Sequence, residues 1–69
     1  MERDEVSSSN ISSIGYDLDS RTLEVEFTDG SVYQYSGVSS GEYDGLMNAE
    51  SKGKFLNANI KGRYSYVRL

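Results

Sequence analysis

The sequence predicts a small α+β domain, built from a three-stranded antiparallel β-meander, one or two short helices packed on one face of the meander, and a short C-terminal strand. Three observations lead to this prediction. Apolar and polar residues alternate strictly along residues 23–27, and an Asp29-Gly30 turn follows, which is typical of a β-hairpin. Farther along the chain, apolar residues recur at helical spacing. The length of 69 residues allows one domain with a modest core.

The N-terminal end of the chain is charged and polar. We expect residues 1–5 to be frayed, so that a single domain spans residues 6–69. Alternation of apolar with polar or small residues then predicts a first strand at residues 11–18. A short turn separates this strand from the second, at residues 23–27.

The loop after the second strand decides where Tyr33 and Tyr35 point. A two-residue loop would pair both tyrosines with glutamates on the polar face, whereas a three-residue loop ending on Gly30 would pair them with Val25 and Leu23 on the apolar face. Because the chain has few other large apolar residues, we expect the three-residue loop, with Gly30 in the left-handed conformation.

Two helical segments and a last strand complete the prediction. Ser39 and Glu42 form a capping-box pattern, and the spacing that follows predicts a first helix over residues 40–49. A second helical segment is predicted at residues 55–60, and a closing strand at residues 64–67. The residues expected to cover the apolar face of the sheet are Tyr43, Leu46 and Met47.

The sequence contains neither Cys nor His. This composition excludes disulfides, zinc sites with these ligands, Cys–His and Ser–His nucleophile pairs and a histidine proton shuttle. Glu24 and Glu26 share one face of the second strand, but this spacing occurs on any solvated strand, so we assign them neither acid–base catalysis nor a metal. We expect no catalytic residue, cofactor or metal, and therefore no enzyme.

The sequence also bears on location. No apolar stretch approaches the ~20 residues that span a bilayer, and the N-terminus, Met1-Glu2-Arg3-Asp4-Glu5, lacks an apolar signal core. We therefore expect a cytoplasmic protein with no membrane partner. Because the chain starts with Met and carries no tag, we expect it to be a complete small gene product.

Charge is distributed unevenly along the chain. The first fifty residues hold two basic residues and all eleven acidic ones, a balance of −9, whereas residues 51–69 hold five basic residues and no acid. A basic segment with aromatic side chains among its charges suits a single-stranded nucleic acid. The candidate nucleic-acid-binding residues are therefore Lys52, Lys54, Lys61, Arg63, Arg68 and Tyr64. The alternative, which the charge pattern alone favours, is an ordinary solvated face that packs beside the acidic strands.

Tyr33 and Tyr35 also allow two interpretations. Exposed aromatic side chains on a sheet can stack on unpaired bases. In the other interpretation, the same two rings fill the core beneath the first helix. Because the sequence has only two Phe and no Trp to fill a core, we favour the second interpretation.

Three motifs follow one another along the chain. They are Ile14-Gly15-Tyr16-Asp17, then Leu23-x-Val25-x-Phe27-x-x-Gly30-x-x-Tyr33-x-Tyr35, and then Ala49-x-Ser51-x-Gly53-x-Phe55-x-Asn57. In this order they resemble the KTSC domain family, which is named for its occurrence at the C-terminus of some lysyl-tRNA synthetases and is also found as a free-standing bacterial or phage protein. The resemblance covers about residues 6–67, and one departure is Ser39, where the family's Pro is expected.

The resemblance implies a binding module rather than an enzyme, and it makes no residue catalytic. RNA is the ligand usually suggested for the family, because of the synthetase context. We therefore expect a non-enzymatic module that binds RNA or another single-stranded nucleic acid. The alternative is a protein–protein adaptor or regulator, for instance a small phage-encoded protein acting on a host factor, and the net charge of −4 favours this alternative.

Overall fold

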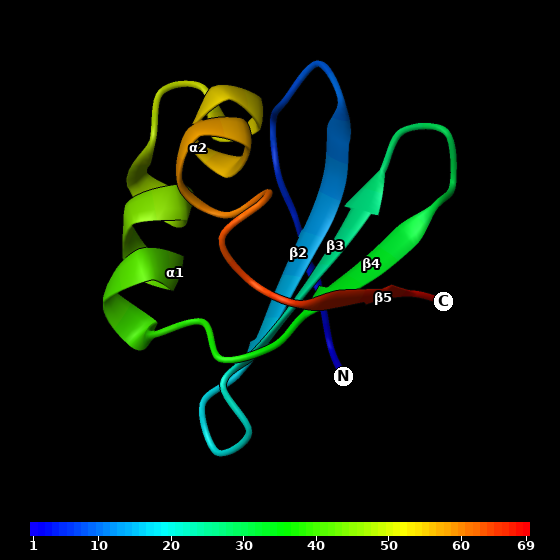
Figure 1. The fold of residues 1–69 in the computed structure, drawn as a ribbon. Helices are drawn as coiled ribbons and strands as arrows, with labels where there is room; N and C mark the ends of the chain where they lie inside the picture. The colour runs from blue at the N-terminus through cyan, green and yellow to red at the C-terminus, as the bar shows by residue number, and fades with distance from the viewer.

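The strands form one antiparallel sheet in which the spatial order follows the order along the chain, β1-β2-β3-β4-β5. A computed structural model describes residues 1–69, and Figure 1 shows both helices on the same side of the sheet. In chain order the elements are β1 (Asp4–Glu5), β2 (Ile11–Asp17), β3 (Thr22–Phe27), β4 (Val32–Tyr35), α1 (Ser40–Asn48), α2 (Lys52–Asn59) and β5 (Tyr66–Arg68).

The α+β class is confirmed, but the predicted three-stranded sheet is wrong, because the sheet has five strands. The predicted meander corresponds to β2, β3 and β4, and the predicted C-terminal strand joins the same sheet as β5. β1 lies within the residues expected to be frayed, where Asp4 pairs with Ile14 and Glu5 with Ser13. A strand of two residues has no alternation from which a sequence pattern could predict it.

The β3–β4 hairpin has the predicted register. Tyr33 and Tyr35 lie opposite apolar residues of β3 and share their face of the sheet. The Phe27 N–H donates a hydrogen bond of 2.9 Å to the Ser31 carbonyl oxygen, which closes a three-residue loop. Gly30 ends this loop with a φ of +91°, as predicted for a left-handed glycine.

A serine caps the N-terminus of each helix. Ser39 Oγ accepts a hydrogen bond from the Glu42 N–H at 3.2 Å, and Ser51 Oγ accepts one from the Lys54 N–H at 3.3 Å. The first helix matches its prediction to within one residue, whereas the second begins three residues before its predicted start because Ser51 caps it. Neither helix combines the length and the apolar character that a bilayer-spanning helix requires.

The core lies between the apolar face of the sheet and the helices. Leu46 from α1 is buried, and Tyr43 and Met47 pack partly buried against the core, as predicted. Tyr16 of β2 stacks on Tyr43 at 4.6 Å between ring centroids, which ties α1 to the sheet. The buried apolar residues are Ile11, Ile14, Leu23, Val25, Tyr35, Val38, Leu46, Leu56 and Ile60.

β5 forms one edge of the sheet, beside β4. Tyr66 lies opposite Tyr35, and Arg68 lies opposite Tyr33. Because directly opposed residues share a face, the side chains of Tyr66 and Arg68 project on the same side of the sheet as the helices. All three residues of β5 are exposed, so neither helix covers this part of the sheet.

Candidate functional site

The apolar face of the sheet carries a groove beside the helices. The groove has a volume of about 590 Å³. Its floor consists of aromatic rings from three strands, and the segment after α2 forms one side. We call it the aromatic groove and define it by Phe27, Asp29, Tyr33, Tyr35, Lys61 and Tyr66, with Arg68 at its rim.

The four rings of the aromatic groove form one contiguous cluster centred on Tyr33. Tyr33 meets Phe27 edge to face at 5.6 Å, and Tyr66 lies tilted 5.6 Å from Tyr33 and 5.9 Å from Tyr35, measured between ring centroids. Exposure rises across the cluster, from 2% of Tyr35 to 59% of Tyr66. The groove is therefore anchored in the core at one end and open to a ligand at the other.

Burial, with a smaller contribution from the neighbouring phenols of Tyr33 and Tyr66, raises the pKa of Tyr35 above its ordinary value. Tyr35 therefore remains neutral at physiological pH. It serves the groove as an apolar floor rather than as a charged group.

Two cations face the aromatic rings. Lys61 Nζ lies 5.4 Å from the centroid of the Phe27 ring, and the Arg68 guanidinium carbon lies 5.9 Å from the centroid of the Tyr33 ring. Both distances allow a cation–π attraction. Lys61 and Arg68 are two of the candidate residues that the sequence predicted, and the structure brings them to the same groove.

The other four candidate residues do not line the aromatic groove. Arg63 and Tyr64 both approach Glu42 of α1, Arg63 at 3.9 Å and Tyr64 through a hydrogen bond of 3.4 Å from its hydroxyl. Lys52 and Lys54 lie in the first turn of α2, where Lys54 is exposed. The basic residues of the C-terminal segment thus lie at three separate places: Lys61 and Arg68 at the aromatic groove, Arg63 beside Glu42, and Lys52 and Lys54 at the start of α2.

Sequence reasoning gave no binding role to Phe27, Asp29 or Tyr66. Phe27 and Tyr66 meet Tyr33 only because β3 and β5 pair with β4 on its two sides. The β4–β5 pairing joins residues separated by both helices, and no local pattern encodes it. Tyr33 and Tyr35 were expected in the core, and the structure places Tyr35 there while Tyr33 is half-buried at the groove.

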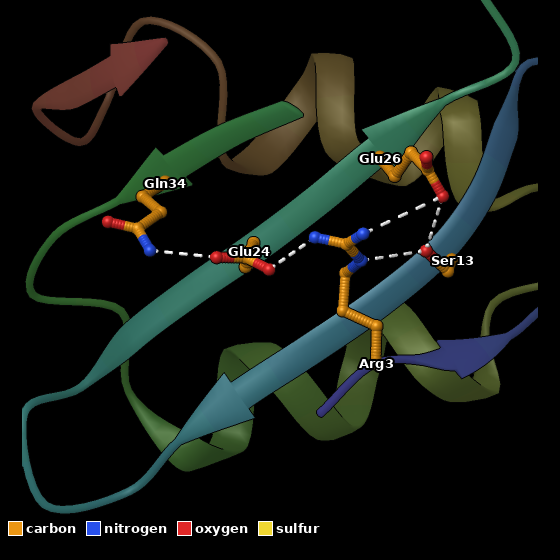
Figure 2. Close-up of polar contacts among 5 residues, drawn as sticks. All are labelled: Arg3, Ser13, Glu24, Glu26 and Gln34. Atoms are coloured by element: carbon orange, nitrogen blue, oxygen red, sulfur yellow. Dashed lines mark hydrogen bonds and ion pairs between the residues drawn. The ribbon is translucent and has the colours of Figure 1, made fainter. Parts of the chain in front are cut away.

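The opposite face of the sheet carries a polar network (Figure 2). Arg3, from the N-terminal arm before β1, reaches across β2 and forms an ion pair with Glu24. Arg3 also donates a hydrogen bond of 3.0 Å to Ser13 Oγ, and its guanidinium lies 3.9 Å from the Glu26 carboxylate. From the other side, the Gln34 side-chain amide donates a hydrogen bond of 2.7 Å to Glu24. The expectation that Glu24 lies on a solvated face is wrong, because the residue is only 5% exposed.

Burial of the Glu24 carboxyl group by itself favours its neutral form. Hydrogen bonds from Gln34 and Arg3, together with the positive charge of Arg3, outweigh burial, so the pKa of Glu24 is lowered from its ordinary value. The carboxylate thus stays ionised and paired. Nowhere in the chain do three or more Asp or Glu side chains gather as they would to hold a metal ion, and we interpret this network as structural.

Comparison with known proteins agrees with this architecture. The family model for the KTSC domain matches residues 7–64. The chain belongs to the KTSC domain family. A crystal structure of a KTSC domain protein from Yersinia pestis has a TM-score of 0.93 and 45% sequence identity to this domain, and the match covers 99% of this chain and 96% of that one.

Two further relatives show the settings in which such a KTSC domain occurs. An uncharacterized protein of Stutzerimonas stutzeri is 37% identical over 100% of this chain and 99% of its own length. A lysine–tRNA ligase of Nostoc punctiforme is 39% identical over 86% of this chain, but the match covers 10% of the ligase. The domain therefore occurs both by itself and as a small part of a much larger protein.

Proposed function

We propose that this KTSC domain is a non-enzymatic module that binds single-stranded RNA, and that the aromatic groove is its binding surface. The observation that carries the proposal is the combination of contacting rings and two cations in one open groove. A base can stack on Tyr66, which is 59% exposed, and such stacking contributes about 1–3 kcal/mol per base. A further support is the match to part of a lysine–tRNA ligase, a protein whose name states that it acts on tRNA.

The charges of the domain shape the expected binding. Lys61 and Arg68 can contact phosphates and release counterions. The −9 balance of the first fifty residues opposes a polyanion elsewhere on the molecule. We therefore expect weak binding that falls steeply with added salt. A single strand is favoured over a duplex because only unpaired bases can be splayed out onto aromatic side chains.

A titration of fluorescently labelled single-stranded RNA at about 50 mM salt, where phosphate contacts are strong, tests the proposal. We expect the double variant Lys61→Glu/Arg68→Glu to abolish binding. The double variant Lys52→Glu/Lys54→Glu is the matched control, because it makes the same change in net charge at residues outside the groove. Tyr66→Ala should weaken binding at least fivefold, since it removes the most exposed ring.

The competing function is that of a protein–protein adaptor, which the net charge of −4 favours. An adaptor should retain no single-stranded RNA even at low salt, and it should capture a specific protein instead. Equal loss of RNA binding in both charge-reversal variants would show that net charge, and not the aromatic groove, governs the interaction. Circular dichroism of each variant establishes that the fold persists.

A further inference from the structure

Asp29 is an unexpected member of a groove proposed to bind a polyanion. Its carboxylate is exposed at the tip of the β3–β4 hairpin and lines the aromatic groove. Hydrogen bonds from the Ser31 hydroxyl and then from the Ser31 N–H, with a smaller contribution from the charge of Arg68, lower the pKa of Asp29. The groove therefore holds a permanent negative charge that no phosphate would favour.

The hydrogen bonds of Asp29 leave one of its oxygens available. Ser31 donates from its N–H at 2.9 Å and from its hydroxyl at 2.6 Å, and both bonds reach Oδ1. Oδ2 forms no hydrogen bond within the chain. The same two bonds fix the orientation of the carboxylate and leave Oδ2 as a free acceptor on a residue that lines the groove.

The aromatic groove thus offers an acceptor and donors around a stacking surface. Asp29 supplies only acceptors, and Arg68, above the Tyr33 ring, supplies only donors. Guanine has the complementary pattern, with acceptors at O6 and N7 on one edge and donors at N1 and N2 on the adjoining edge. In adenine and in cytosine a ring-nitrogen acceptor lies beside the amino group. In uracil two carbonyl oxygens flank the single N–H. Each of these bases would therefore turn an acceptor toward the carboxylate of Asp29.

We infer that the aromatic groove selects guanine within single-stranded RNA, with Asp29 Oδ2 accepting from both N1–H and N2–H of the base and Arg68 donating to O6 or N7. The inference rests on the proposed function and adds base specificity to it. In this arrangement the turn residue Asp29 also contacts the base, while Lys61 remains free for a phosphate. Arg68 and Asp29 thereby act as specificity-determining residues, and the rings supply the sequence-tolerant part of the affinity.

The test uses labelled RNA heptamers of uridine that differ only at the central position, which is guanosine, inosine, adenosine or uridine. All four have the same charge and length, so the ratio of their dissociation constants reports on the central base. We expect the guanosine heptamer to bind about tenfold more tightly than the adenosine and uridine heptamers, as one good bidentate pair allows. Inosine, which lacks the N2 amino group, should fall between them.

Two variants that each remove one negative charge distinguish recognition of the base by Asp29 from a general effect of charge on RNA binding. Asp29→Asn keeps a residue that suits the turn before Gly30, and we expect it to remove the guanosine preference. Asp19→Asn changes an exposed aspartate in the turn between β2 and β3, and we expect it to keep the preference.

The outcomes distinguish the inference from the function on which it rests. Equal affinity for all four heptamers, or a guanosine preference that survives Asp29→Asn, would overturn the inference while leaving single-stranded RNA binding in place. The same loss of preference in Asp19→Asn would also overturn it, because the effect would then follow net charge. Absence of binding to every heptamer would overturn both proposals.

Discussion

Among single residues, Gly30 determines the shape of the hairpin tip that carries Asp29. Its φ of +91° lies in the left-handed region, and a Cβ at this position would have no other atom within 4 Å. A substitution here therefore meets backbone strain and no steric clash.

We expect Gly30→Val to lower the free energy of unfolding by about 1–2 kcal/mol, because a β-branched residue fits poorly at positive φ. Gly30→Asn should cost less, since Asn tolerates the left-handed conformation. Urea denaturation followed by circular dichroism measures both values. Identical midpoints for the two variants would show that backbone strain does not set the cost.

Glu24 links single-residue chemistry to the response of the fold to acid. Its pKa in the folded protein is lowered from the ordinary value of 4.5, so the ionised carboxylate stabilises the fold above about pH 4.5. That stabilisation is lost as the pH falls through the folded-state pKa. Glu24→Gln removes the titrating group but keeps its size and an oxygen that accepts hydrogen bonds.

We therefore expect the wild-type protein to lose stability between pH 4.5 and lower values more steeply than Glu24→Gln does. Urea midpoints measured at stepwise pH values test this expectation. The glutamine variant should be the less stable one near neutral pH, because it no longer forms the ion pair with Arg3. Parallel pH curves for the two proteins would contradict the assigned role of Glu24.

Among the secondary-structure elements, β1 depends on a close approach to β2. A Cβ at Gly15 would lie 2.5 Å from the Glu2 carbonyl oxygen and 2.9 Å from Arg3 Cγ. Both atoms belong to the N-terminal arm that leads into β1. Only glycine at this position of β2 lets the arm lie close enough for Arg3 to cover Glu24.

We expect Gly15→Ala to displace the N-terminal arm and to lower the free energy of unfolding by more than about 1 kcal/mol. Gly41→Ala is a matched control in the first turn of α1, where a Cβ would meet only Ser39 Oγ at 4.0 Å. That change should be neutral or should stabilise the protein by up to about 1 kcal/mol, because Ala is the better helix former. If thermal unfolding shows the two variants to be equally stable, the close approach at Gly15 is unimportant.

These elements also show which parts of the fold a sequence can predict. The β3–β4 hairpin was predicted because its alternation and turn lie within residues 23–35, and its register because the chain has few other large apolar residues to fill a core. β1 was missed because its docking depends on Arg3 meeting a glutamate 21 positions later. The groove itself was not predicted. Lys61 and Arg68 were candidate binding residues and Tyr33 and Tyr35 were weighed as a stacking surface, but the positions of Phe27 and Tyr66 follow from strand pairing rather than from local pattern.

In the molecule as a whole, the order of the strands determines where the two ends of the chain go. β1 and β5 occupy opposite edges of the sheet, and the helices come between β4 and β5 in the chain. The polar network on one face belongs to the N-terminal half, and the aromatic groove on the other face is completed by the last strand. Both faces share β3 and β4, but the polar network is completed by the N-terminal arm and the aromatic groove by the C-terminal strand.

The dependence of the aromatic groove on β5 has a consequence for how firmly the groove itself is held. β5 has three residues, all exposed, and none belongs to the buried core. Its detachment would remove Tyr66 and Arg68 from the groove while leaving the buried residues in contact, which makes it a local opening of low free energy. We therefore expect a ligand of the groove to meet an equilibrium between docked and detached strands, with an apparent affinity equal to the intrinsic affinity scaled by the docked fraction.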